Sequence, residues 1–199
     1  MSATTLDLIR HGEPEGGRRY RGDGIDDPLS EKGWRQMWEA VGDHAVWNRI
    51  VTSPLRRCRE FAEALGERHS IPVAVEPRLR EVGFGAWEGR PPAEIEHEDP
   101  GILDRFYSNP IRYRPTGAEP LDAFRARVGA TFDDLIAACP DEHLLIVAHA
   151  GVIRAVIAHI LNTPPEAMYR MTVDNAGLTR IRTHPARPPS LLFHGRRRL

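Results

Sequence analysis

The chain is almost without lysine and has only two cysteines, and both shortages limit what the protein can be. Lys32 is the only lysine among 27 basic residues, and 28 acidic residues bring the formal net charge to −1. This balance gives no bulk electrostatic reason to expect a nucleic-acid partner or an anionic membrane surface. Two cysteines cannot build a disulfide framework, and no Cys-x-x-Cys pair is present to indicate a redox or zinc motif.

Long apolar runs are also absent, and none approaches the roughly 20 residues of a membrane span. The N-terminus has no basic region followed by a long apolar core, so we expect no signal peptide and a cytoplasmic location. The histidines lack metal-ligand spacing, and we expect neither a metal nor another cofactor. The chain has 199 residues, 41% of them hydrophobic and 28% charged. This length and composition predict one globular domain over residues 1–199.

Short apolar strands alternate with amphipathic helices, a pattern typical of a mostly parallel α/β sheet. We therefore expect a three-layer α/β/α sandwich with a mostly parallel central sheet. Ser30 is the predicted N-cap of the first helix, and residues 195–199 are predicted to fray. Strands are expected near residues 6–10, 47–52, 71–76, 144–148, 178–183 and 190–193, and helices near 31–41, 54–69, 91–108, 119–138 and 150–160.

Two of these strands end in a histidine with a glycine one or two residues later. Arg10 and His11 end the first strand, and His149 follows the buried-looking strand 144–148. In open α/β sheets ligands bind at the carboxyl ends of strands. Taken alone, each histidine could simply end a strand or sit satisfied in the core, but the repeated position favours two imidazoles that face one pocket.

Arginines follow the second strand in the run Ser53-Pro54-Leu55-Arg56-Arg57. Pro54 is expected at the first position of the next helix. Arginines at a helix N-terminus oppose the helix macrodipole. An anion bound there would explain them, because guanidinium groups and helix amides would share it.

Glu81 is an isolated carboxylate among apolar and glycine neighbours, a setting that suits a proton donor. An exposed loop glutamate is the alternative if the segment is considered alone. Gly83 and Gly85 do not form a dinucleotide-binding loop, since no helix and second strand follow at the required spacing. In the loop over residues 13–29, Arg18, Arg19 and Arg21 could contact the substrate, or they could be solvated side chains of a basic loop.

Taken in order, these patterns resemble the histidine phosphatase superfamily, also called phosphoglycerate-mutase-like. Its marks are R-H-G at residues 10–12, S-P-L-x-R at 53–57, L-x-E-x-x-x-G-x-W-E-G at 79–89, and a second histidine at His149. Together they cover roughly residues 6–155. Each motif is modest, but four in the same order form a specific signal.

The resemblance implies a metal-independent phosphomonoesterase that acts on a small-molecule ester. His11 would attack phosphorus and become a phosphohistidine, and Glu81 would protonate the leaving alkoxide. Arg10, Arg57 and His149 match the family's phosphate pocket, where they would balance the charge of the transition state. Arg57 holds the motif position, although the adjacent Arg56 could share its role. The oligomeric state is left open.

Some positions depart from the family pattern. Pro14 and Gly17 stand where many relatives have threonine and asparagine, and Phe61 replaces a threonine. These departures put the rim of the pocket in doubt and leave the central residues intact.

Within the family, the short interval between Glu81 and His149 favours a phosphatase over a mutase. The run over residues 11–34 is similar to bacterial α-ribazole phosphatases, which implies α-ribazole 5′-phosphate as the substrate. The alternatives are a mutase or a phosphoprotein phosphatase with the same chemistry, or a phosphate-binding domain without catalysis. The intact set of predicted site residues argues against the last.

Overall fold

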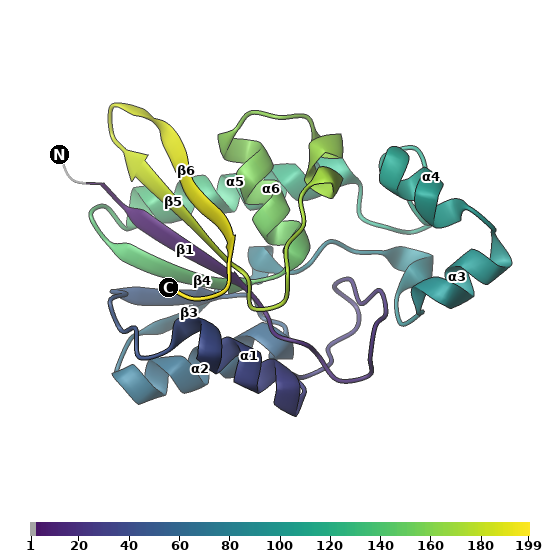
Figure 1. Ribbon diagram of the computed structural model, residues 1–199. Coiled ribbons are helices and arrows are strands. Elements are labelled where there is room, and N and C mark those ends of the chain that lie inside the picture. The colour runs from purple at the N-terminus through teal and green to yellow at the C-terminus, as the bar shows by residue number, and fades with distance from the viewer. Residues whose placement is uncertain (1–2) are drawn as a thin grey trace.

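A six-stranded sheet forms the middle of the molecule, with helices on both faces (Figure 1). The computed structural model describes residues 3–199, so the first two residues of the predicted domain lie outside the described part. The strands are β1 (Thr5–Arg10), β2 (Arg49–Thr52), β3 (Val73–Val75), β4 (His143–Ala148), β5 (Leu178–His184) and β6 (Arg187–Arg196). The helices are α1 (Glu31–Val41), α2 (Arg56–His69), α3 (Pro92–Glu98), α4 (Ile102–Ser108), α5 (Leu121–Ala138) and α6 (Ala150–Ile160), with 3-10 turns η1 (Pro77–Leu79), η2 (Gly85–Trp87) and η3 (Pro165–Arg170). The predicted three-layer α/β architecture is confirmed.

The strand order β3-β2-β4-β1-β5-β6 brings the predicted functional strand ends together. Strands β3, β2, β4 and β1 are parallel, whereas β5 and β6 add an antiparallel edge. In this register Arg10 lies beside Ala148, and Thr52 lies beside Val147. The residues that follow β1, β2 and β4 therefore emerge at the same edge of the sheet.

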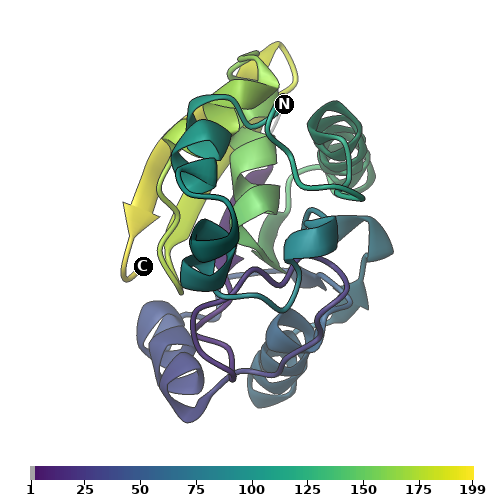
Figure 2. The same ribbon diagram turned by 90° about the vertical axis from the view of Figure 1, so that its right-hand side faces the viewer.

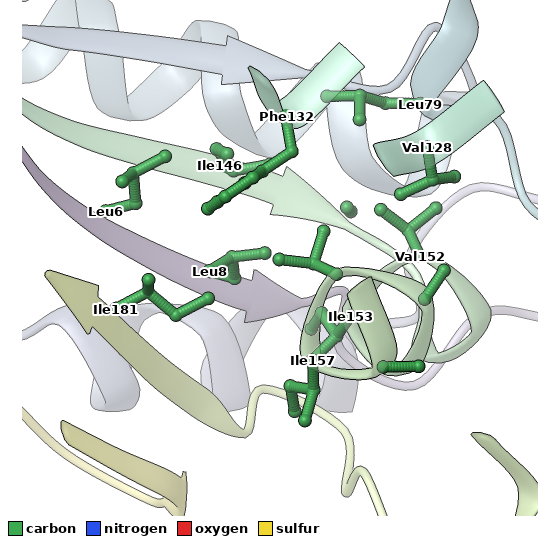
Figure 3. Close-up of a cluster of buried hydrophobic side chains, with 14 of the residues drawn as sticks. Leu6, Leu8, Leu79, Val128, Phe132, Ile146, Val152, Ile153, Ile157 and Ile181 are labelled. Atoms are coloured by element: carbon green, nitrogen blue, oxygen red, sulfur yellow. The ribbon is translucent and has the colours of Figure 1, made fainter. Parts of the chain in front are cut away.

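Each face of the sheet has its own hydrophobic core. On one face, α5 and α6 cover the strands, and Figure 3 shows their side chains meeting over β1, β4 and β5. The labelled core residues are Leu6, Leu8, Leu79, Val128, Phe132, Ile146, Val152, Ile153, Ile157 and Ile181. On the other face, α1 and α2 pack Met37, Phe61 and Leu65 against Ile9, Leu145 and other strand residues. Burial on both faces explains why β4 is a continuous apolar run.

A small third cluster lies beyond the carboxyl ends of the strands. Trp87, Ile95 and Phe106 are buried there, between η2, α3 and α4. Figure 2, which looks onto this end of the molecule, shows α3 and α4 in front of the sheet. These two short helices thus stand over the edge where the predicted site residues emerge.

Local details agree with the sequence at α1 and differ at two other places. Ser30 is the N-cap of α1, and its hydroxyl accepts the Gly33 N–H at 3.0 Å. The prediction that Pro54 opens α2 was wrong: Leu55 is the N-cap with extended backbone, and the helix begins at Arg56. The Arg56 N–H donates to the Asp26 carboxylate at 2.7 Å, so a distant loop fixes where this helix starts.

The C-terminal tail was also predicted wrongly. Strand β6 extends to Arg196, because it pairs with β5 as far as Leu178. Leu199 packs against the core on the α1 face, and its N–H reaches the Ala40 carbonyl at 3.3 Å. Tertiary contacts therefore order a segment whose composition alone indicates fraying.

No helix in residues 3–199 has the length and apolar character needed to cross a bilayer.

Candidate active site

A pocket of about 160 Å³ opens where the strand ends meet the short helices. Four of the five predicted site residues line it, namely Arg10, His11, Arg57 and Glu81. They come from β1, α2 and the loop before η2, which are far apart in the sequence. The topology thus assembles the predicted group, with His149 immediately behind it.

His11 is held as a neutral imidazole with one nitrogen free to react. Its Nδ1 lies 2.8 Å from the Gly12 carbonyl oxygen, which can only accept a hydrogen bond. Nδ1 therefore carries the proton, and Nε2 keeps its lone pair. Burial, reinforced by the nearby Arg10 and Arg57 cations, places the pKa of His11 well below its ordinary value. The arrangement suits a nucleophile.

His149 is fully buried and packs against His11. The two rings meet edge to face with centroids 5.2 Å apart. The His149 Nε2 lies 2.7 Å from the Ser53 hydroxyl oxygen, so the S-P-L-x-R motif touches the second histidine directly. Burial lowers the pKa of His149 as well, with Arg57 as the next cause. The side chain stands behind His11 and is not part of the pocket wall.

Arg10 and Arg57 bring two cations to the pocket without carboxylate partners. Arg10 donates to the Val173 carbonyl oxygen at 2.6 Å. Arg57 is 1% exposed and donates to the carbonyl oxygens of Ile25 and Gly22 at 2.7 and 2.9 Å. Within residues 3–199 neither guanidinium forms a hydrogen bond with an acidic side chain. Buried or half-buried cations whose hydrogen bonds go only to carbonyl groups are stabilised when an anion binds beside them.

The adjacent Arg56 has a different environment. Its side chain is exposed, and its Nε donates to Glu60 at 2.7 Å. Only Arg57 of the two lines the pocket. The register of α2 therefore separates two arginines that the sequence alone could not distinguish.

The loop over residues 13–29, which carries Arg18, Arg19 and Arg21, forms part of the pocket lining. Arg19 and Arg21 line the pocket, and both form ion pairs with Asp27 at 2.7 Å. Arg18 is exposed and lies outside the pocket lining. Arg19 and Arg21 therefore stabilise the conformation of their own loop through Asp27.

Glu81 reaches the pocket between η1 and η2. One carboxylate oxygen accepts the Val82 N–H at 3.0 Å, and the other accepts the Gly151 N–H at 3.2 Å. The carboxylate thus bridges its own loop to the first turn of α6, which begins next to His149. This position is compatible with proton transfer to an ester oxygen in the pocket.

Several lining residues belong to no predicted group. Arg154 lies on α6, where its Nε donates to the Met171 carbonyl oxygen at 2.9 Å. Its guanidinium carbon is 5.5 Å from the centre of the Tyr169 ring. A single arginine in the otherwise apolar run 150–158 was the available sequence signal. Aromatic side chains complete the wall, and no motif marks them: Tyr20, Phe84, Tyr107 and Tyr169.

No group of three or more histidine, cysteine, aspartate or glutamate side chains is placed to hold a metal ion in the described part of the chain. The polar groups of the pocket are mainly guanidinium and imidazole, which bind anions. The arrangement is therefore suited to a phosphoryl group.

Comparisons with known proteins agree with this geometry. The sequence model of the histidine phosphatase superfamily (branch 1) matches residues 6–194. The chain is 33% identical over 171 residues to the adenosylcobalamin/alpha-ribazole phosphatase of Salmonella typhimurium, covering 84% of each chain. It is 34% identical over 179 residues to the glucosyl-3-phosphoglycerate phosphatase of Mycobacterium tuberculosis, covering 82% of this chain and 78% of that protein.

Solved structures give the same result. The native structure of a mycobacterial glucosyl-3-phosphoglycerate phosphatase superposes with a TM-score of 0.85 at 30% identity, over 97% of this chain and 99% of that one. The alpha-ribazole phosphatase of Shigella flexneri gives a TM-score of 0.82 at 27% identity, over 98% of each chain. The protein belongs to the histidine phosphatase superfamily, as its motifs predicted, and it is a phosphatase.

Proposed function

We propose that the protein hydrolyses phosphate monoesters without a metal, through a phosphohistidine on His11. The observation that carries this proposal is the state of His11: a buried neutral imidazole with Nδ1 bound to the Gly12 carbonyl, beside two guanidinium groups that form no hydrogen bond with an acidic side chain within residues 3–199. A nucleophile with a free lone pair and a cationic oxyanion pocket are the two parts that phosphoryl transfer requires.

The first step forms the phosphoenzyme. The lone pair of His11 Nε2 forms a bond to phosphorus while the bond from phosphorus to the ester oxygen breaks. The electron pair of the broken bond leaves on that oxygen, which takes a proton from the carboxylic acid of Glu81. Arg10 and Arg57 neutralise charge on the three equatorial oxygens, where a loose transition state spreads it.

The second step releases phosphate. The Glu81 carboxylate takes a proton from a water molecule as the oxygen of that water attacks phosphorus. The nitrogen–phosphorus bond breaks, and its electron pair returns to His11 Nε2. We keep His149 in the proposed phosphate-binding set as the residue that supports His11 from behind, because its ring packs against the group that carries the phosphoryl.

For the substrate, we propose α-ribazole 5′-phosphate. Its support is the similarity to the Salmonella enzyme together with the aromatic rings that line the pocket. A second candidate follows from Arg154, which forms no ion pair within residues 3–199 and lines the same pocket. A cation there favours an ester whose alcohol carries a carboxylate, as in glucosyl-3-phosphoglycerate.

The reaction is tested by phosphate release in EDTA from α-ribazole 5′-phosphate, glucosyl-3-phosphoglycerate, p-nitrophenyl phosphate and a phosphopeptide, with 3-phosphoglycerate also assayed for isomerisation. A preference for the ribazole ester supports the proposed substrate. Isomerisation of 3-phosphoglycerate would show a mutase, and no reaction with any ester would indicate a binding domain.

The intermediate is tested by acid-labile labelling. A rapid quench with a phosphorus-labelled ester should leave label on the wild-type protein that acid removes and base retains. His11→Ala should lose both label and turnover. His97→Ala is the matched control, since His97 is exposed and lies outside the pocket. Full turnover in His11→Ala would contradict the mechanism.

A further inference from the structure

Four aromatic rings that the proposed hydrolytic steps do not use line the active-site pocket, and we call them the aromatic wall. Tyr20 comes from the loop after β1, Phe84 from the segment after Glu81, Tyr107 from α4 and Tyr169 from η3. Four segments that are distant in the sequence thus place rings around one opening. The ester's alcohol part must lie on this side, because the phosphoryl group is held by His11 and the buried arginines.

The wall rests on a rigid base. Phe106 is fully buried. The centroid of its ring lies 4.8 Å from that of Tyr169, 5.1 Å from that of Trp87 and 5.3 Å from that of Tyr107. Tyr20 packs against Phe84 at 4.9 Å. Ring pairs at these distances contribute to stability beyond the area that they bury. The wall is therefore preorganised before any ligand arrives.

Tyr107 is the one ring of the wall that is exposed. Its side chain is 50% exposed, although it lies next to the buried Phe106 on a helix of seven residues. Its hydroxyl oxygen is 3.4 Å from the Tyr20 hydroxyl oxygen, so two residues of the wall also meet at their polar ends. A single exposed aromatic residue would need no explanation. An exposed ring that lines the proposed catalytic pocket together with three others presents a surface to a ligand.

The angles between the rings define the shape of that ligand. Tyr107 and Tyr169 are 6.1 Å apart at an interplanar angle of 64°, so together they form a corner. A flat group can lie against one ring and meet the edge of the other, which is the preferred geometry of aromatic clusters. Arg154 lies over Tyr169 and adds donors for oxygen or nitrogen atoms on the same group.

We propose that Tyr107, supported by Tyr20 and Tyr169, binds a flat aromatic or heteroaromatic group on the alcohol part of the phosphate ester. This inference rests on the proposed function and narrows its substrate class. Tyr107 is thus a specificity-determining residue, and the pocket selects esters by the ring that they carry.

Two esters with the same reacting bond provide the test: α-ribazole 5′-phosphate and ribose 5-phosphate, which lacks the ring. Stacking of a base on an aromatic side chain changes binding about 10-fold or more. The wild-type protein should therefore prefer the ring-bearing ester by about 10-fold or more in kcat/KM, mainly through KM. Tyr107→Ala should lower this ratio about 10-fold, whereas Tyr107→Phe should preserve it because the ring remains.

Tyr113→Ala is the matched control, because Tyr113 packs against the same small hydrophobic cluster as Tyr20 and Tyr169 but lies outside this pocket. It should keep the preference. A preference that survives in Tyr107→Ala, or one that falls equally in Tyr113→Ala, would overturn the inference.

Calorimetric titration of the two esters into His11→Ala separates this inference from the proposed reaction. Tighter binding of the ring-bearing ester, lost when Tyr107→Ala is added, supports the aromatic subsite even if the wild-type protein releases no phosphate. Equal affinities for both esters would overturn the subsite even if phosphate release proceeds as proposed.

Discussion

The carboxylate of Glu81 lies against the backbone of Gly151, whose N–H donates to it at 3.2 Å. A Cβ atom added at Gly151 would stand 2.2 Å from the nearer carboxylate oxygen, far inside van der Waals contact. Glycine at this position therefore allows the first turn of α6 to approach the proposed proton donor. The H-A-G sequence after β4 thus places His149 at the start of α6 and also lets the first turn of this helix contact Glu81.

Gly151→Ala should separate stability from activity. Alanine favours a helix interior over glycine by about 1 kcal/mol, an advantage that is smaller in the first turn, where Gly151 lies. The added Cβ would meet the end of the Glu81 side chain, which can rotate, and Val82 Cγ1 at 3.3 Å. The unfolding temperature should therefore change little. Displacement of the Glu81 carboxylate should reduce kcat/KM about 10- to 100-fold on an alkyl phosphate. Calorimetry and phosphate release measure the two effects, and a parallel loss of both would show that Gly151 serves the fold alone.

Glu81→Gln tests the proton donor through the leaving group. An alkoxide needs a proton as its bond to phosphorus breaks, whereas p-nitrophenolate leaves without one. The variant should lose about 10²- to 10⁴-fold in kcat on an alkyl ester and much less on p-nitrophenyl phosphate. Single-turnover kinetics isolate the first step from hydrolysis of the phosphoenzyme. Equal losses on both esters would remove Glu81 from the proton-transfer role.

The strand ends and the principal motifs could be predicted from the sequence because they depend on local chemistry. A continuous apolar run, a terminal glycine and a following helix signal are all short-range features, and they locate Arg10, His11 and His149. The family resemblance then supplied partners that no local pattern relates to one another.

The rim of the pocket could not be predicted in this way. Tyr20, Tyr107 and Tyr169 meet only because α3 and α4 fold over the end of the sheet, and their spacing along the chain carries no signal. The burial of His149 behind His11 also depends on tertiary packing. The ordered C-terminal tail has the same origin, since contacts with α1 outweigh its polar composition.

Arg57 should set the pH range in which His11 is reactive. Burial is the main cause that lowers the pKa of His11, and the cations of Arg10 and Arg57 lower it further. Attack requires the neutral imidazole, so the acid limb of kcat/KM should lie below the ordinary histidine value of about 6.5. Arg57→Gln removes one cation, which should raise the pKa of His11 and move the acid limb to higher pH.

Arg56→Gln is the matched control, because Arg56 is exposed and bound to Glu60. All three proteins should be assayed with the same ester, so that titration of the substrate cancels, and the His11 ring protons should be followed by NMR. An acid limb that stays in place in Arg57→Gln, or shifts equally in both variants, would contradict electrostatic control by Arg57.

Asp7 anchors β1, the strand that ends at Arg10, through a buried network. Its side chain is fully buried and accepts hydrogen bonds from the Trp47 indole and the Arg180 guanidinium at 2.9 and 2.6 Å, and His143 Nε2 lies 2.9 Å away. Burial alone would raise the pKa of Asp7, but the hydrogen bonds from His143, Arg180 and Trp47 outweigh it and lower the pKa. The ionised carboxylate therefore stabilises the folded state at pH values above the ordinary aspartate pKa of about 3.9.

Asp7→Asn should reduce the free energy of unfolding by about 3 kcal/mol at pH 7, measured by urea denaturation. The matched control Asp133→Asn breaks an exposed contact with His159 and should cost less than about 1 kcal/mol.

The unfolded chain takes up the Asp7 proton at higher pH than the folded protein does. The stability that Asp7 contributes is therefore lost as pH falls through its lowered pKa. The wild-type and Asp7→Asn unfolding curves should accordingly converge in acid. A difference that persists unchanged in acid would mean that packing around residue 7, and not the charge of Asp7, holds β1 in place.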